Sequence, residues 1–217
     1  MGHARSSLIP LRLLAGLILL VVIVSCGGRL PATHYYVLEL NPGEQGNPSG
    51  GSGDGIAVGV KAFRVDPPYD QDQIVYRLRE RSSEVGFYAY HRWAAPLSRM
   101  LPVVVADGLA GTVGLRAIEP VVAGREYDAY LVGRVLALEE SDHRDGQDVR
   151  LRLALELRLP DGVEIWSRTV EGQETIDTDD VGDIVERMNE VLRRVVSETR
   201  DEFAESVRRV PAGDKRN

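Results

Sequence analysis

Residues 149–159 alternate between apolar and mostly charged side chains, and no other segment constrains the fold as strongly. The apolar positions are Val149, Leu151, Leu153, Leu155, Leu157 and Leu159, and the residues between them are Arg150, Arg152, Ala154, Glu156 and Arg158. A period of two places these sets on opposite faces of a β-strand. One face is therefore predicted to lie under a core and the other to contact water, which is typical of antiparallel sheets.

Shorter segments predict further strands, because they are rich in β-branched and aromatic residues or alternate in polarity. They span residues 35–40, 56–65, 74–79, 85–90, 129–138 and 163–170. Residues 66–70, 142–146 and 160–162 are predicted turns or loops. Gly, Pro and Ser dominate residues 41–55, which predicts a loop, and that loop contains no phosphate-binding glycine pattern.

Two helices are also predicted. Pro96 suits the first turn of the first helix, but Pro102 falls inside it, so that this helix either kinks there or begins nearer Leu101. Thr178 is the predicted N-cap of a long second helix that ends before Pro211. The apolar face of the second helix comprises Val181, Ile184, Val185, Met188, Val191, Leu192, Val195, Val196 and Phe203. Its other faces carry Arg187, Arg193, Arg194 and Arg200.

These elements predict an α+β fold. One mostly antiparallel sheet carries a mid-chain helix and a long C-terminal helix packed on it. The length suits one domain, predicted over residues 35–209 and followed by a disordered tail over 210–217.

The N-terminal segment predicts a lipoprotein signal over residues 1–25 and a lipidated tether over 26–34. Arg5 and Arg12 precede or begin a short apolar run, and no acidic residue comes before Cys26. Residues 23–27, Ile-Val-Ser-Cys-Gly, resemble a bacterial lipobox, in which the cysteine becomes the lipidated first residue. The run is shorter than the about 20 apolar residues that a membrane span needs. A retained anchor and a plain secretory signal remain the alternatives.

Net charge and cysteine content limit which partners the chain can bind and which cross-links it can form. The formal net charge is −7, and loss of the signal removes two arginines and no acid. This balance argues against nucleic acid as a partner, because nucleic acid is bound by clustered basic residues. Cys26 is the only cysteine, so no disulfide can form within the chain.

No catalytic or metal-binding constellation stands out, and neither a cofactor nor a metal is expected. His34, His91 and His143 do not have the spacing of a zinc site. No Gly-x-Ser-x-Gly motif is present, and the lone cysteine is the proposed lipid site. The aspartates between residues 177 and 183 are interpreted as the start of a helix, with a calcium site as the alternative.

Aromatic residues gather in two short segments. Tyr35 and Tyr36 follow the tether, and residues 87–93 contain Phe87, Tyr88, Tyr90 and Trp93. Packing within strands, contact with a partner protein and contact with lipid are all open interpretations. The candidate partner interface comprises Tyr88, Tyr90, Trp93, Tyr35 and Tyr36.

The order of these motifs resembles that of a known family. The lipobox is followed by residues 35–38 (Tyr-Tyr-Val-Leu), 74–77 (Ile-Val-Tyr-Arg) and 87–96 (Phe-Tyr-Ala-Tyr-His-Arg-Trp-Ala-Ala-Pro). In this respect the chain resembles the ABC-type transport auxiliary lipoproteins, the PqiC-like lipoproteins. The resemblance implies a non-enzymatic, lipid-anchored periplasmic subunit that accompanies an MCE-domain protein and an ABC permease and ATPase. Such systems move lipids or other hydrophobic molecules between membranes, and Gly27 after the cysteine favours the outer membrane.

Two other functions are weighed beside this one. The chain could itself bind a hydrophobic ligand as a carrier or chaperone, if the apolar face of residues 151–159 lined a cavity instead of forming the core. A hydrolase is the more distant alternative, because carboxylates are plentiful. Association into a homo-oligomer is left open.

Overall fold

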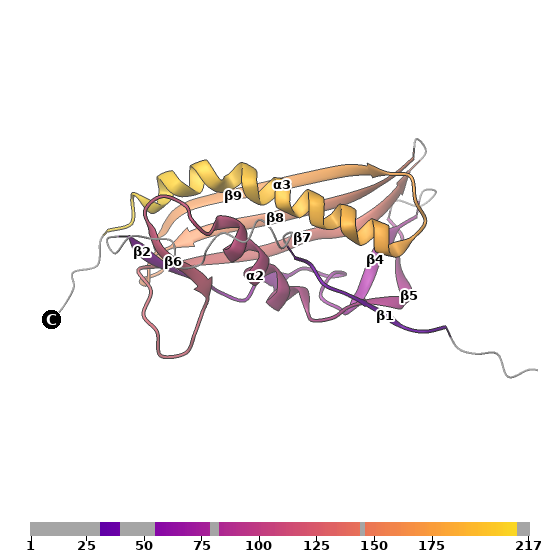
Figure 1. Ribbon diagram of the computed structural model, residues 1–217, viewed down its shortest axis with the longest axis horizontal. Helices are drawn as coiled ribbons and strands as arrows, with labels where there is room; N and C mark the ends of the chain where they lie inside the picture. The colour runs from indigo at the N-terminus through magenta and orange to yellow at the C-terminus, as the bar shows by residue number, and fades with distance from the viewer. Residues whose placement is uncertain (1–30, 40–54, 79–82, 144–145, 212–217) are drawn as a thin grey trace, which may run out of the picture. The chain divides into compact units, whose positions relative to one another are not determined.

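The structure is a computed structural model that describes residues 31–39, 55–78, 83–143 and 146–211 (Figure 1). The elements described here all belong to one unit, Thr33–Asn217. Cys26, the signal segment and most of the predicted tether lie outside the described residues. The same holds for nearly all of the predicted loop 41–55 and for most of the predicted tail.

Nine strands and two helices make up this part of the chain. The strands are β1 (His34–Tyr36), β2 (Ile56–Val60), β3 (Arg64–Val65), β4 (Gln73–Arg77), β5 (Val85–Trp93), β6 (Leu115–Pro120), β7 (Ala129–His143), β8 (Gly146–Arg158) and β9 (Glu164–Ile176). The helices are α2 (Leu97–Leu109) and α3 (Val181–Val207).

The 15-residue strand β7 organises the sheet. Along one edge it pairs antiparallel with β8, which pairs antiparallel with β9. Along its other edge it pairs in parallel with β2, β3 and β4 in turn. Beyond these, β6 adds in parallel to β2, β5 adds antiparallel to β4, and β1 adds in parallel to β5.

The sheet is therefore mixed, and the prediction of a mostly antiparallel sheet is wrong in this respect, although the α+β class is confirmed. The alternation along β8 indicates that one face of the strand is buried, but it does not indicate the direction in which the neighbouring strands run. Parallel pairs require crossover connections. Here the chain crosses from β5 through α2 to β6, and this long-range path leaves no local pattern.

The alternation itself is confirmed. Val149, Leu151, Leu153, Leu155 and Leu157 are each 1% exposed or less. They lie under α3, which runs along β8 and β9 (Figure 1). Helix α2 contacts β6, β2, β3 and also α3, so the two helices cover the same face of the sheet. The opposite face carries the charged set of β8.

Helix α3 has the predicted apolar stripe, and every residue predicted for that stripe is buried. Its cap differs from the prediction. The N-cap is Asp180, whose carboxylate accepts hydrogen bonds from the backbone N–H groups of Gly182 (2.7 Å) and Asp183 (3.2 Å). Thr178 instead accepts a hydrogen bond from the Asp180 N–H and donates one to Asp183. Several acceptors follow one another here, and only the backbone geometry selects one.

Helix α2 begins at Leu97, with Pro96 as its N-cap and Pro102 inside it. A start nearer Leu101 is therefore wrong. Pro102 has no N–H to donate to the carbonyl of Ser98, four residues earlier. The backbone N–H of Phe63, between β2 and β3, takes that place and donates to the Ser98 oxygen at 3.0 Å. The proline thus leaves open an acceptor that ties the helix to the sheet.

Other boundaries also moved. The predicted strand 56–65 divides into β2 and β3. Within the predicted loop 142–146, β7 continues to His143 and β8 begins at Gly146, and β9 continues to Ile176. Strand β6 was not predicted, because an irregularity between Ile56 and Ala57 in its pairing with β2 breaks the period of two. Within the described residues, neither helix combines the length and the apolar character needed to cross a membrane.

Candidate functional site

The predicted aromatic residues meet where β1 adds to β5, at one edge of the sheet. Tyr35 is 67% exposed and Tyr90 is 39% exposed, and Phe87, three residues before Tyr90 in β5, is exposed as well. The strand registers place Tyr35 and Phe87 on the same face of the sheet, away from α3. We call these three residues the aromatic edge. Trp93, by contrast, is 3% exposed and lies in the core, so its role in this structure is packing.

Tyr36 and His91 brace β1 against β5 from the other face. The Tyr36 hydroxyl lies 2.8 Å from Nδ1 of His91, and the ring of His34 stacks on His91 with centroids 5.2 Å apart. Burial lowers the pKa of His91, and the neighbouring His34 lowers that pKa further. Burial also raises the pKa of Tyr36. Tyr36 is only half-buried, and its hydroxyl is engaged inside the fold.

Two consecutive carboxylates, Glu139 and Glu140, are buried on opposite faces of β7. Glu139 has no exposed surface and accepts hydrogen bonds from the Tyr69 hydroxyl (2.6 Å) and from Nε of Arg77 (2.7 Å). Burial, together with Glu139, raises the pKa of Tyr69 to about 12. Each carboxylate oxygen of Glu139 therefore has its own donor, as a buried carboxylate requires.

Glu140 is 5% exposed and accepts a hydrogen bond from the Tyr88 hydroxyl at 2.5 Å. Burial raises the pKa of Glu140, and Asp142 and Asp179 raise it further. Burial raises the pKa of Tyr88 as well. Because adjacent strand residues point to opposite faces, Glu139 and Glu140 cannot act on one substrate as an acid–base pair.

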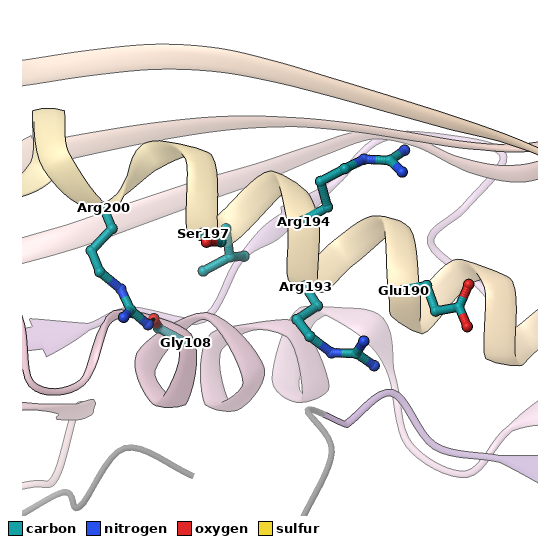
Figure 2. Close-up of a pocket in the computed structure, with 7 residues that line it drawn as sticks. Gly108, Glu190, Arg193, Arg194, Ser197 and Arg200 are labelled. Carbon is teal, nitrogen blue, oxygen red and sulfur yellow. Dashed lines mark hydrogen bonds between the residues drawn. The ribbon is translucent and has the colours of Figure 1, made fainter. Parts of the chain in front are cut away.

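A cavity of about 450 Å³ lies between α2 and α3 (Figure 2). Its lining is mostly polar and comprises Gly108, Glu190, Arg193, Arg194, Val196, Ser197 and Arg200. Figure 2 shows Arg193 and Arg200 extending from α3 toward α2, whereas Arg194 extends to the other side. The sequence predicted only that these arginines lie off the apolar face of α3. Arg193 and Arg200 are seven residues apart. This spacing of two helical turns indicates that Arg193 and Arg200 share one face of the helix.

Two of the aspartates between residues 177 and 183 act at the start of α3. Asp180 caps it, and Asp183 interacts with Thr178. Among the described residues, no three His, Cys, Asp or Glu side chains are grouped so that they could hold a metal ion. The calcium alternative therefore has no ligand set in that part of the chain.

Comparison with known proteins adds to this geometry. A family model described as "ABC-type transport auxiliary lipoprotein component" matches residues 36–199. In fold the chain is similar to protein XCC0632 of Xanthomonas campestris, assigned to family model DUF330, with a TM-score of 0.62 and 17% identity over 83% of this chain and 97% of that one. It is also similar to an uncharacterised protein, with a TM-score of 0.63 and 15% identity over 80% of this chain and 99% of that one. No curated protein matches the chain.

Proposed function

Because the chain belongs to the family of ABC-type transport auxiliary lipoprotein components, we propose that it docks an MCE-domain protein of an ABC transport system to a membrane. In this proposal Cys26 carries the lipid anchor and the domain lies on the periplasmic side. The outer membrane is favoured, since Gly27 and not an aspartate follows the cysteine. The permease and ATPase complete the system, which moves lipids or other hydrophobic molecules.

The aromatic edge is the observation that supports a docking role. Tyrosine side chains dominate binding energy at many interfaces because they combine a large apolar area with a polar tip. Tyr35 follows Cys26 by nine residues, and nine extended residues reach about 30 Å. An anchored Cys26 therefore keeps Tyr35 within that distance of the membrane surface, where a membrane-bound partner is available.

The alternating leucines favour docking over the carrier alternative. A carrier needs an apolar face that is free to line a cavity for its ligand. In β8 that face is covered by α3, and its leucines form the core. The cavity between α2 and α3 is lined by charged residues and is unsuited to a hydrocarbon chain. The buried carboxylates of Glu139 and Glu140 each accept a hydrogen bond from a tyrosine, and the buried carboxylate of Asp148 accepts one from Gln173, which supports a non-enzymatic role.

Affinity purification tests the docking role. The tagged full chain, expressed in its native host and crosslinked before mild solubilisation, should recover an MCE-domain protein and a permease. The double variant Tyr35→Ala, Tyr90→Ala should reduce this recovery at least about tenfold, since two interface anchors are lost. The control Val163→Ala removes an exposed apolar side chain in the β8–β9 turn and should leave recovery unchanged. Recovery of the lipoprotein alone would refute docking, and equal recovery with both variants would refute this edge as the interface.

The anchor is tested separately. Cys26→Ala should leave an unprocessed or soluble protein that fails to complement a deletion. The control Ser25→Ala retains a small residue before the cysteine and should be processed normally. Mass spectrometry of the mature N-terminus reports the acyl chains directly. An unacylated terminus in the native host, or full complementation by Cys26→Ala, would remove the anchor from the proposal.

A further inference from the structure

Strand β5 is longer than the strand that lies along its outer edge. On one side it pairs with β4, and on the other side it pairs with β1 through His91, Arg92 and Trp93 (Figure 1). Within the described part of the chain, residues 85–90 of β5 have no strand beside them on the β1 side. We call residues 85–90 the open edge. Six extended residues span about 20 Å, which is enough for a further strand.

The backbone groups of Val85 and Phe87 face the open edge. In an antiparallel pair, successive residues direct their N–H and C=O groups alternately toward the partner strand and away from it. The Leu78 N–H donates to the Glu84 oxygen at 3.5 Å, and the same register continues through Gly86 to Phe87, before it shifts. Gly86 therefore bonds to β4, whereas the N–H and C=O groups of Val85 and Phe87 point away from β4. No described residue supplies a partner for these groups.

The open edge is not protected against pairing. Charged side chains and proline keep many sheet edges from pairing with another chain. The open edge has neither, since its sequence is Val-Gly-Phe-Tyr-Ala-Tyr. Strands β6 and β9, which each pair with one strand, are protected. Four of the 13 residues of β9 are charged, and β6 has two charged residues and ends in a proline.

Side chains hold the open edge in place and offer an apolar contact beside it. The ring of Tyr76 packs over the backbone of Gly86 and leaves no space for a β-carbon there. Tyr88 is fixed by its hydrogen bond to the buried Glu140. Phe87 is 37% exposed on the other face of the sheet. A preformed edge lowers the ordering cost of binding, and an exposed aromatic ring on it can contact the side chains of an added strand.

We propose, as an extension of the docking role proposed above, that the docked protein adds an extended segment to the open edge as a further strand. Backbone hydrogen bonds to Val85 and Phe87 give affinity, and apolar side chains at alternate positions contact the Phe87 ring. Strand β1 already adds to the same edge of β5 with three residues. The segment that fits is about six residues long, apolar on the side of Phe87 and free of proline, which lacks the N–H group.

Photo-crosslinking in the native host tests strand addition. Benzoylphenylalanine in place of Phe87 in the full chain should link to one contiguous segment of the MCE-domain protein, located by mass spectrometry. Val85→Pro replaces an N–H group of the open edge by a proline ring, so it should reduce this link at least about tenfold. The matched control Val85→Ala shortens the same side chain, keeps the N–H group and should retain the link.

The outcomes separate strand addition from docking itself. If Val85→Pro leaves recovery of the MCE-domain protein unchanged and residue 87 forms no link, strand addition is refuted and docking stands. A proline-sensitive link to one segment of a different protein would support strand addition and refute the MCE-domain protein as the partner. A link to residues 26–33 of the same chain, or to a second copy, would overturn the proposal. Absence of both link and recovery would refute both proposals.

Hydrogen exchange of the wild-type chain provides a measurement that needs no variant. In the protein alone, the N–H groups of Val85 and Phe87 should exchange at least about tenfold faster than that of Gly86, which bonds to β4. Addition of the purified MCE-domain protein should slow exchange at Val85 and Phe87. Slow exchange at these two residues in the protein alone would show that the edge is already bonded. That result, or unchanged exchange in the complex, would overturn the proposal.

Discussion

Gly172 of β9 and Val191 of α3 are in direct contact: a β-carbon built on Gly172 would stand 2.6 Å from Cγ1 of Val191. The same β-carbon would stand 2.6 Å from Cγ2 of Val195, one helical turn further along. The helix therefore approaches the sheet as closely as backbone permits at this point. That approach sets the height of α3 over the leucines of β8, and with it the position of the arginines that line the cavity.

Replacement of Gly172 by alanine should destabilise the fold. The added methyl group meets two β-branched side chains that have little freedom to move, and we expect a loss of about 2–3 kcal/mol in the free energy of unfolding. Urea denaturation of the domain, followed by circular dichroism, measures this loss. Thr169→Ala, an exposed position on the same strand, is the control and should change stability far less. Equal effects of the two substitutions would show that α3 shifts freely over β9.

Replacement of Arg77 by alanine should lower the stability of the fold more than replacement of Arg134, another arginine that contacts the sheet. Arg77→Ala leaves the fully buried carboxylate of Glu139 with Tyr69 as its remaining described hydrogen-bond partner, and breaking a buried pair in this way costs about 3–5 kcal/mol. Arg134→Ala breaks the exposed pair with Asp66 and should leave stability nearly unchanged, because water replaces the interaction. Thermal unfolding of both variants at neutral pH tests the difference. Similar melting temperatures would mean that Glu139 finds another donor.

Glu140→Gln should stabilise the protein at neutral pH and not in acid. Burial raises the pKa of Glu140 above its ordinary value of 4.5, so the folded state holds this proton more tightly than the unfolded state does. Stability from this group is complete below pH 4.5 and is lost as the pH rises through the folded pKa. Glutamine accepts the same hydrogen bond from Tyr88 without a charge. We expect a gain of roughly 1 kcal/mol at pH 8 that shrinks toward pH 4.5.

Denaturant unfolding of both proteins across this pH range gives the difference directly. Because His91 and the other titrating groups are common to both proteins, their contributions cancel. A gain that is constant with pH, or that grows in acid, would contradict the assigned ionisation of Glu140.

The N-cap of α3 gives a further comparison. Asp180→Ala removes the acceptor for two backbone N–H groups and should cost about 1 kcal/mol. Asp179→Ala removes the same charge one residue earlier, where the side chain caps nothing in the structure, and should cost less. The midpoints of urea unfolding measure this difference in stability between the two variants. A larger effect at Asp179 would mean that charge near the helix end matters more than the cap.

The interface candidates show where sequence reasoning about the site succeeds and where it stops. An aromatic residue in a strand is compatible with either face, so the cluster of residues 87–93 could be found without knowing which members are exposed. Trp93 lies in the core, and Tyr90 lies at the surface. Tyr36 and Tyr88 have partners, His91 and Glu140, that lie more than fifty positions away in the chain. No local pattern reports such a pairing.

The sequence by itself determined the elements whose burial repeats with their own period. The leucines of β8 and the stripe of α3 were readable because one buried face imposes a period of two or 3.6 on neighbouring residues. Only the tertiary structure decided the parallel pairing of β2, β3 and β4 with β7. The same holds for the backbone hydrogen bond from Phe63 to Ser98 and for the cavity that Arg193 and Arg200 line. Each of these joins segments that are distant in sequence or depends on how two elements approach each other. Their geometry exists only once the whole sheet has formed.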